Sequence, residues 1–165
     1  MDVFDEELLR LWEVLNKCDV KYIMVGGLSV NFNGHHRITE DLDIWLNDTI
    51  ENRKKFRKAF NELGYGDFES FETIQFLPGW TEFHVGNGIV LDIMTTMKGL
   101  EHYSFEECLE LASSANLNGV NVPFLHINHL LLNKKAVARP KDLSDVFELE
   151  KIKEQRRQLG LDSPE

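Results

Sequence analysis

The sequence contains only two cysteines, Cys18 and Cys108, and neither lies at metal-ligand spacing from another cysteine or a histidine. A disulfide framework and a zinc site are therefore not expected. The chain also lacks a recognisable signal peptide and an apolar run of about 18 residues, the length that spans a membrane. These absences predict a reduced, soluble, cytoplasmic protein that has no membrane partner.

Positive charge is scarce in this chain. There are 18 lysines and arginines against 28 aspartates and glutamates, which gives a formal net charge of −10. Proteins that hold long RNA or DNA usually carry a basic stripe, because phosphate contacts drive that affinity. The basic residues here form only local clusters. A small molecule or a protein is thus favoured over a nucleic acid as the partner, although modification of a tRNA end through a local patch stays open.

Two common nucleotide-binding loops are absent. Neither Gly-x-x-x-x-Gly-Lys-Ser/Thr nor Gly-x-Gly-x-x-Gly occurs, which argues against P-loop NTPases and dinucleotide-binding proteins. No internal repeat or low-complexity linker divides the chain. With 165 residues and 42% hydrophobic content, we expect one domain over residues 1–165, with its core at about 5–150.

Hydrophobic periodicity predicts an alternation of helices and strands, and the expected fold class is α/β (α+β) with a mixed sheet packed against helices. Basic residues in the run 53–58 are expected to form the solvated outer face of an amphipathic helix. The expected order is a helix at 5–17, a strand at 21–25, a short helix at 28–32, a strand carrying Asp41 and Asp43, a helix near 51–63, strands near 73–77, 81–85 and 89–94, a helix near 104–112, a strand around 120–125, and two helices in a C-terminal segment at about 127–158.

A Gly-Gly-x-Ser turn follows the first predicted strand. Gly26 and Gly27 have no Cβ, so the backbone there can turn sharply and approach a bulky anion closely. The Ser29 hydroxyl nearby would add a donor at the start of the following helix. This pattern suits a phosphate, while an ordinary strand-to-helix turn is the alternative.

Two carboxylates occur two residues apart inside the next apolar strand. Side chains along a strand alternate faces, so Asp41 and Asp43 point the same way while Leu42 and Ile44 point to the other side. Parallel acids beside a core repel each other, and a hard cation such as Mg²⁺ would remove that cost. The alternative is a solvated turn acid followed by a helix-capping acid.

A third acid, Asp92, is the only charge in the apolar run 89–94. A buried strand does not normally carry an isolated carboxylate unless something compensates it. Asp92 is expected to complete a three-carboxylate metal site with Asp41 and Asp43. A carboxylate hydrogen-bonded to neighbouring backbone is the competing interpretation.

In this order the three motifs resemble the nucleotidyltransferase superfamily with the DNA-polymerase-β-like fold. The resemblance is to its small bacterial stand-alone members, which are related to antibiotic nucleotidyltransferases and to abortive-infection and toxin–antitoxin nucleotidyltransferases. The likeness extends to residues 37–39, 92–95 with Gly99, 133–136 and 139–145, and it covers roughly residues 5–150.

The resemblance implies a Mg-dependent nucleotidyl transfer, in which an acceptor hydroxyl attacks the α-phosphorus of an NTP and pyrophosphate leaves. It assigns two Mg²⁺ ions, with Mn²⁺ as a substitute, to Asp41 and Asp43. Asp92 would bind the ion that activates the acceptor and take its proton. Gly26, Gly27 and Ser29 would grip the β- and γ-phosphates.

Several basic residues are candidates for contacting the triphosphate. Arg37, Lys134 and Lys141 are the chosen nucleotide-binding residues, from a set that also includes Lys98, Lys135 and Arg139. An equally weighted interpretation places the lysines of 134–141 at helix ends, where cations favour the last turn and Pro140 fits the first position of a helix.

The sequence leaves some choices open. The histidines at 35, 36 and 84 have no assigned role, and either Glu82 or Phe83 faces Asp92, depending on hairpin register. Trp80 and Phe83 either line an acceptor pocket or belong to the core. A toxin–antitoxin partner protein and an NTP-binding regulator without turnover are the alternative functions. The acceptor, the choice of base and the oligomeric state are undetermined.

Overall fold

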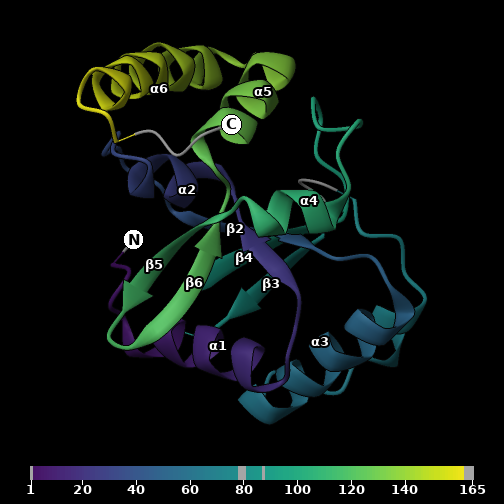
Figure 1. The fold of residues 1–165 in the computed structure, drawn as a ribbon. Helices are drawn as coiled ribbons and strands as arrows, with labels where there is room; N and C mark the ends of the chain where they lie inside the picture. The colour runs from purple at the N-terminus through teal and green to yellow at the C-terminus, as the bar shows by residue number, and fades with distance from the viewer. Residues whose placement is uncertain (1, 78–80, 87, 162–165) are drawn as a thin grey trace.

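The computed structural model describes residues 2–77, 81–86 and 88–161, and it places a six-stranded mixed sheet between two groups of helices (Figure 1). The elements in chain order are α1 (Glu6–Lys17), β1 (Tyr22–Met24), α2 (Gly26–Phe32), β2 (Asp41–Leu46), α3 (Ile50–Leu63), the 3₁₀ turn η1 (Glu69–Glu72), β3 (Glu82–Val85), β4 (Ile89–Met94), α4 (Phe105–Glu110), β5 (Ser113–Leu117), β6 (Val120–Phe124), α5 (Ile127–Val137) and α6 (Pro140–Gln158).

The strands lie in the order β3-β4-β2-β1-β6-β5. β2 pairs in parallel with β4, and β1 pairs in parallel with β6, while the other neighbours are antiparallel. The expected α/β fold with a mixed sheet is therefore confirmed.

Local sequence signals explain where the helices begin and end. The Asp5 carboxylate accepts hydrogen bonds from the first-turn N–H groups of Glu7 and Leu8 at the start of α1. Ser104 and Glu107 form a reciprocal capping box at the start of α4. Gly64 ends α3 in the left-handed region, with φ of 81°, where a residue without Cβ is favoured.

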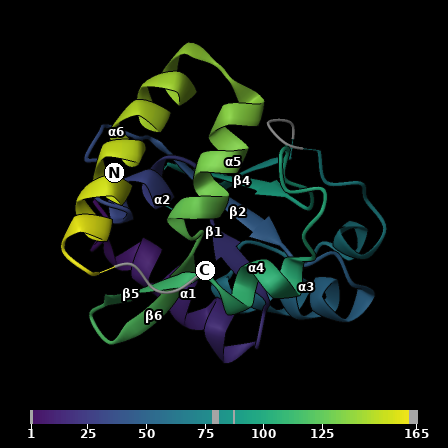
Figure 2. The same cartoon turned by 45° about the horizontal axis from the view of Figure 1, so that its top comes forward.

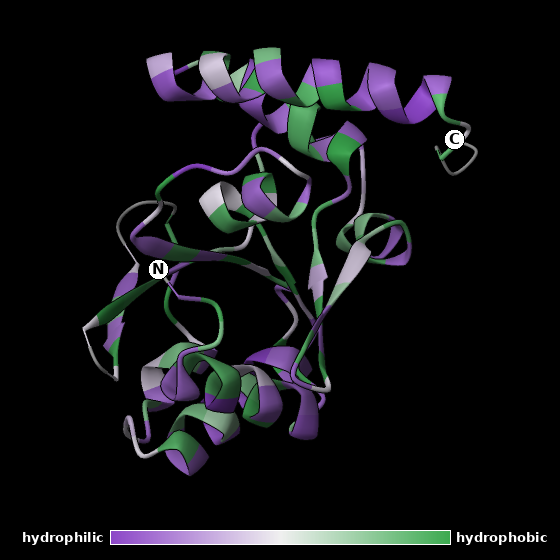
Figure 3. Cartoon of the chain, turned by 90° about the vertical axis from the view of Figure 1, so that its left-hand side faces the viewer, coloured by the Kyte–Doolittle hydropathy of each residue, from purple (hydrophilic) through white to green (hydrophobic). Residues whose placement is uncertain are grey.

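The two faces of the sheet bury different cores. Leu42, Ile44 and Leu46 of β2 face the layer of α1 and α3, with their neighbours on β1 and β4. Trp45 of β2 and Val25 face the opposite layer, which includes α4, α5 and α6. Figure 2 shows α5 and α6 side by side, and Figure 3 shows the sheet between the two helical layers, with a largely hydrophilic α6 outermost.

One expected strand, at 73–77, is not formed, and the position of Arg53 explains why. Arg53 is 8% exposed, and its guanidinium donates to the carbonyl oxygens of Phe71 and Ile74 at 3.1 and 2.6 Å. Those carbonyls are therefore satisfied by a side chain and not by a neighbouring strand. The expectation that the basic residues of 53–58 all form a solvated face was wrong for Arg53.

The prediction also missed β5, because Ser113–Leu117 has little apolar alternation and relies on its antiparallel partner β6. The short helix begins at Gly26, two residues earlier than expected, so both glycines lie in its first turn. In the β3–β4 hairpin, Glu82 is paired with Asp92, which settles the register: Glu82 faces the same side as Asp92, and Phe83 faces the α1–α3 core.

Neither of the cysteines is bonded to the other, and both are buried. In the part of the chain that is described, no helix has both the length and the apolar character needed to cross a membrane.

An aromatic cluster between α3 and the sheet generates a stability prediction. The Phe60 ring is 1% exposed and contacts the rings of Phe56, Phe71 and Phe83 with centroid distances of 4.6–5.5 Å. Phe60→Ala should lower the free energy of unfolding by about 3–5 kcal/mol, because it leaves a cavity among rigid rings. Urea denaturation measures this loss. Phe4→Ala, at a ring that is 53% exposed, is the control and should change stability by less than about 0.5 kcal/mol.

Candidate active site

The glycine turn packs directly against the second acid of β2. Gly26 has φ of +61°, and a Cβ at this position would lie 1.9 Å from Oδ2 of Asp43. At Gly27 a Cβ would lie 2.3 Å from Oγ1 of Thr39. The backbone N–H of Gly27 donates a hydrogen bond to the Asp43 carboxylate. The turn and the carboxylate strand therefore touch, and larger residues would separate them.

The sheet register aligns the acids. Asp43 is directly paired with Asp92 across the parallel β2–β4 ladder, and Glu82 is paired with Asp92 on the other side of β4. Directly paired residues project from the same face, with side chains a few ångströms apart. Asp41 lies two residues before Asp43 on the same face, and it is solvent-exposed.

Burial shifts the ionisation of Asp43. Loss of hydration raises its pKa above the ordinary value of an aspartate, and the nearby Asp41 charge acts in the same direction. The Gly27 hydrogen bond and the charges of Lys134 and Lys141 oppose this increase without cancelling it. Burial therefore disfavours the charged form of Asp43.

A cavity of about 440 Å³ opens beside these acids. Asp43 and Asp92 line it from the sheet, and Lys134 and Arg139 line it from α5 and the α5–α6 junction. The remaining lining residues are Val25, Gly26, Met94, Thr96, Met97, Lys98, Glu101, Asn133 and Val137. Acidic side chains of the sheet and basic side chains of the C-terminal helices therefore line the same cavity.

Lys134 is 3% exposed and is held by two aspartates of α6. Its Nζ lies 2.8 Å from Oδ1 of Asp142 and 3.0 Å from Oδ2 of Asp145. Lys141 is exposed and does not line the cavity, although its charge influences Asp43. Among the described residues, no three histidine, cysteine, aspartate or glutamate side chains stand close enough together to hold a metal ion as they lie.

Gly27, Ser29, Arg37 and Lys141, four of the predicted nucleotide-binding residues, do not line the cavity. Ser29 is fully buried, and its hydroxyl donates to the carbonyl oxygen of Leu125 at 3.3 Å. The sequence predicted that the Ser29 hydroxyl would donate to a phosphate. In the structure this hydroxyl joins α2 to the β6–α5 connection instead. Arg37 has its Nε 2.8 Å from Oδ1 of Asp145, so its guanidinium is directed at α6.

The histidines at 35, 36 and 84 and Phe83, whose roles the sequence left open, do not line the cavity. His35 has its Nε2 3.9 Å from Oδ1 of Asp145, while His36 and His84 are exposed. Phe83 packs in the α1–α3 core, and Trp80 falls outside the described residues.

The prediction missed Glu101, Asn133 and the two methionines as lining residues. Glu101 and Met97 follow β4 closely, and loops after the carboxyl ends of strands often carry ligand contacts. That position in the chain was a usable signal. Asn133 lay in a segment covered by the family resemblance, but its hydrogen bond of 2.9 Å from the side-chain amide to the carbonyl oxygen of Lys98 could not be read from the sequence.

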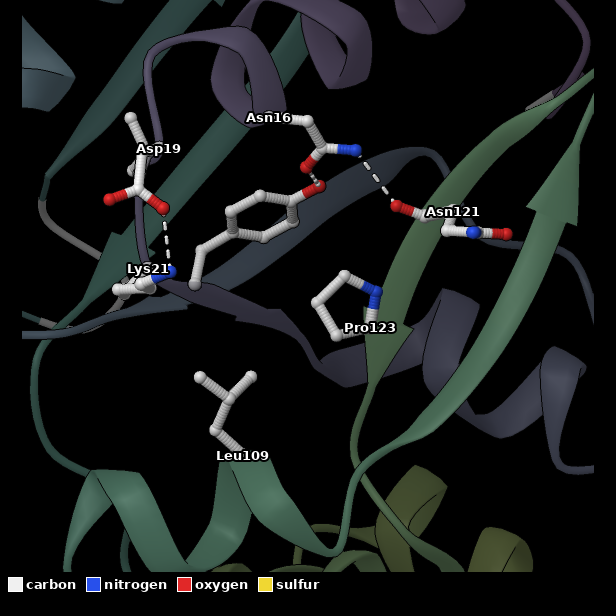
Figure 4. Close-up of a pocket in the computed structure, with 8 residues that line it drawn as sticks. Asn16, Asp19, Lys21, Leu109, Asn121 and Pro123 are labelled. Carbon is white, nitrogen blue, oxygen red and sulfur yellow. Dashed lines mark hydrogen bonds and ion pairs between the residues drawn. The ribbon is translucent and has the colours of Figure 1, made fainter.

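A second hollow, of about 300 Å³, lies away from these acids near the end of α1 and the start of β1 (Figure 4). Tyr22 donates to Asn16 at 3.1 Å, and Asn16 donates to the carbonyl oxygen of Asn121 at 2.9 Å. Asp19 pairs with Lys21 at 2.6 Å. These polar groups bond one another, so this hollow presents less free bonding capacity than the cavity at Asp43.

Solved structures similar to this one include antibiotic nucleotidyltransferases. The lincosamide antibiotic adenylyltransferase LnuA with bound lincomycin is 17% identical, covers 90% of this chain and 97% of its own, and has a TM-score of 0.56. ANT(2'')-Ia in complex with adenylyl-2''-tobramycin is 16% identical over 92% of this chain and 93% of its own, with a TM-score of 0.54. A putative nucleotidyltransferase (TM1012) from Thermotoga maritima is 20% identical over 94% and 91%, with a TM-score of 0.52. At these identities the likeness establishes the fold.

No functionally curated protein sequence matches this one. Residues 5–164 match a protein family described as "Nucleotidyl transferase of unknown function (DUF2204)". The match spans nearly the whole chain, including the glycine turn, the three aspartates and both C-terminal helices. The protein is therefore a member of this nucleotidyltransferase family.

Proposed function

We propose that this nucleotidyltransferase moves a nucleoside monophosphate from a Mg-bound nucleoside triphosphate onto a hydroxyl group of a small molecule, with release of pyrophosphate. The observation that carries the proposal is the distribution of charge around the cavity: Asp43 and Asp92 line it from the sheet, Lys134 and Arg139 line it from α5 and the α5–α6 junction, and Lys98 lines it from the segment after β4. A metal–triphosphate complex complements this charge distribution, because Mg²⁺ binds carboxylates and the phosphate oxygens accept hydrogen bonds from lysine and arginine.

The residues fit a divalent cation. Asp43 and Asp92 are adjacent on one face of the sheet, and burial already raises the pKa of Asp43, so a bound cation would offset an existing cost. Asp41, Asp43 and Asp92 would hold Mg²⁺, or Mn²⁺ in its place, once the side chains close around it. The bound metal would neutralise charge on the phosphate oxygens. Gly26 and Gly27 leave the space in which phosphates can approach.

Nucleotidyl transfer needs a base for the acceptor hydroxyl and positive charge for the leaving pyrophosphate, and residues of this chain can supply both. The acceptor oxygen forms a bond to the α-phosphorus as the bond from that phosphorus to the β-phosphate oxygen breaks. The hydroxyl proton passes to the Asp92 carboxylate, and the electron pair leaves with pyrophosphate. Lys134 and Arg139, which line the cavity, provide positive charge for the departing phosphates. Lys141 adds its charge from outside the cavity, and Arg37 acts from outside it through Asp145.

A small-molecule acceptor is favoured by the size of the cavity, because about 440 Å³ lies within the range of sites for small ligands. LnuA with lincomycin and ANT(2'')-Ia with its adenylylated tobramycin point to the same class of acceptor. A toxin–antitoxin partner or a nucleotide sensor without turnover remains an outcome of the tests below.

A thermal-shift panel tests the proposal. ATP, GTP, CTP and UTP, each with and without Mg²⁺, should include at least one nucleotide that raises the Tm of the wild type only with Mg²⁺. A ligand at 100 times its Kd stabilises by roughly 2.7 kcal/mol. The shift should vanish in Asp43→Asn/Asp92→Asn and persist in Glu13→Gln, an exposed acid on α1. If no nucleotide shifts the wild type, the proposal is wrong. Binding without pyrophosphate release across broad acceptor panels would favour a sensor.

Substitution of Gly26 tests whether the glycine turn must lie directly against Asp43 for a nucleotide to bind. Gly26→Ala should abolish the Mg-dependent nucleotide shift, because its Cβ would displace Asp43. Gly119→Ala is the matched control, since Gly119 also has positive φ, at +92°, but nothing lies within 4 Å of the place that a Cβ would occupy there. Both variants should lose about 1–2 kcal/mol from backbone strain, measured by urea denaturation. Retained nucleotide binding in Gly26→Ala would contradict the arrangement.

The pKa of Asp43 predicts a pH-dependent stability. Because burial raises that pKa, the folded carboxyl keeps its proton at pH values where the unfolded carboxyl has lost it. Its stabilising contribution is complete at low pH and declines as the pH rises through the raised pKa. In the presence of a chelator, Asp43→Asn should therefore be more stable than the wild type at pH 7.5 and similar to it near about pH 3.5, below the ordinary aspartate pKa. Urea denaturation at both pH values measures this. A less stable variant at pH 7.5 would refute it.

A further inference from the structure

Five charged side chains form a continuous network behind the cationic wall of the cavity, which we call the α5–α6 charge network: Arg37, Lys134, Arg139, Asp142 and Asp145. The two aspartates are 0% and 1% exposed. Each of them binds two cations: Asp142 pairs with Lys134 at 2.8 Å and Arg139 at 2.7 Å, and Asp145 pairs with Lys134 at 3.0 Å and Arg37 at 2.8 Å. Three cations against two carboxylates leave one excess positive charge.

The geometry at Lys134 limits what its ammonium group can still bind. An ammonium group has three N–H donors, and the two aspartates accept two of them. Among the described residues the ammonium group has no partner besides these two carboxylates, and Lys134 lines the cavity. The third donor is therefore the one that we expect to reach a ligand in the cavity. A flexible lysine is thereby converted into an oriented donor.

Asp142 can hold Lys134 in this way because its carboxyl group is ionised at neutral pH. Burial alone would raise its pKa, but hydrogen bonds from Arg139 and Lys134 hold the pKa at about 2. Arg139, which is 57% exposed at its side chain, rests on the same carboxylate and lines the cavity. One buried acid therefore sets the position of both cations.

Asp145 extends the network to the loop before β2. Asp145 binds Arg37. Thr39, two residues further along the same loop, lies so close to Gly27 that a Cβ added to Gly27 would clash with it. Asp145 of α6 therefore binds both the loop that carries Arg37 and, through Lys134, helix α5. The same loop contacts the glycine turn through Thr39.

We propose that Asp142 and Asp145 are positioning residues, which orient Lys134 and Arg139 toward the phosphate chain of the nucleotide without touching it themselves. This rests on the proposed function. The ligand recognised is the triphosphate itself, independent of the base, because the donors come from a wall of cations and not from groups that read a base edge.

Simple electrostatics and positioning predict opposite results for the same variant. Asp145→Asn removes a negative charge close to where an anion would bind, so charge alone would tighten triphosphate binding. If the aspartate orients Lys134, the same change weakens binding, because the ammonium loses its fixed direction. A purely structural role would lower stability and leave the affinity of the folded protein unchanged.

Isothermal titration calorimetry with Mg²⁺ and inorganic tripolyphosphate, and in parallel with the nucleotide that gives the largest thermal shift, measures these affinities. Lys134→Met should weaken both ligands roughly 10- to 100-fold, the loss expected for a charge-assisted hydrogen bond. Asp145→Asn and Asp142→Asn should each weaken both by about fivefold or more. In the Lys134→Met background, Asp145→Asn should cause less than about twofold further loss, because it acts through that lysine.

The matched control is Glu150→Gln. Glu150 forms a Lys135 ion pair at 2.6 Å between the same two helices, but both side chains are about half exposed, and neither lines the cavity. Its affinity for tripolyphosphate should equal that of the wild type. Circular dichroism at the temperature of the titration verifies that each variant is folded. If Asp145→Asn does not fold, Lys134→Arg carries the test: it keeps the charge but changes the donor geometry, and it should also lose affinity.

Unchanged or tighter binding in Asp145→Asn and Asp142→Asn, with the wild type binding normally, would overturn the positioning role while leaving the proposed function intact. So would a full further loss in the Lys134→Met background, or undiminished affinity in Lys134→Arg. If the wild type binds neither Mg²⁺–tripolyphosphate nor any Mg²⁺–nucleotide, the proposed function itself fails, and that failure is recognisable because it appears before any substitution is made.

Discussion

Parallel pairing of β2 with β4 is the constraint on which the cavity depends. It places Asp43 directly beside Asp92 on one face, while the alternate residues Leu42 and Leu91 are buried on the other face. A slip of one residue would exchange these faces, moving carboxylates into the α1–α3 core and leucines into the cavity. The hydrophobic core on one side of the sheet thereby holds the chemistry on the other side in register.

The cavity concentrates charge that the protein would be more stable without. Burial disfavours the charged form of Asp43, and Lys134 is removed from water together with two aspartates. Buried charges are tolerated when each has a partner, and removal of one partner is far more costly than removal of all. The α5–α6 charge network meets that condition from within the chain. Asp43 on the sheet accepts a hydrogen bond from Gly27, and its pKa is nevertheless raised, which is the kind of local cost expected at a functional site.

The C-terminal helices link this charge to the rest of the fold. α5 contributes Lys134 and Asn133, α6 contributes the two buried aspartates, and Val146 and Leu149 of α6 pack into the core beneath α4 and α5. The structural likeness to LnuA and ANT(2'')-Ia covers at least 90% of this chain. A fold of this kind supports many acceptors, so the acceptor must be sought through the residues that line the cavity.

The sequence by itself determined the order of most elements, the α/β class and the alternation that puts Asp41 and Asp43 opposite Leu42 and Ile44, because these depend on local periodicity and turn chemistry. The grouping of Gly26, Asp43 and Asp92 followed from motif order. Only the tertiary structure decided that Ser29 is a buried link to Leu125, that Arg53 replaces a strand partner for residues 71–74, and that Glu82 is paired with Asp92. It alone showed Lys134 bound to Asp142 and Asp145, because a long side chain chooses its partners by distance across helices and not by spacing along the chain.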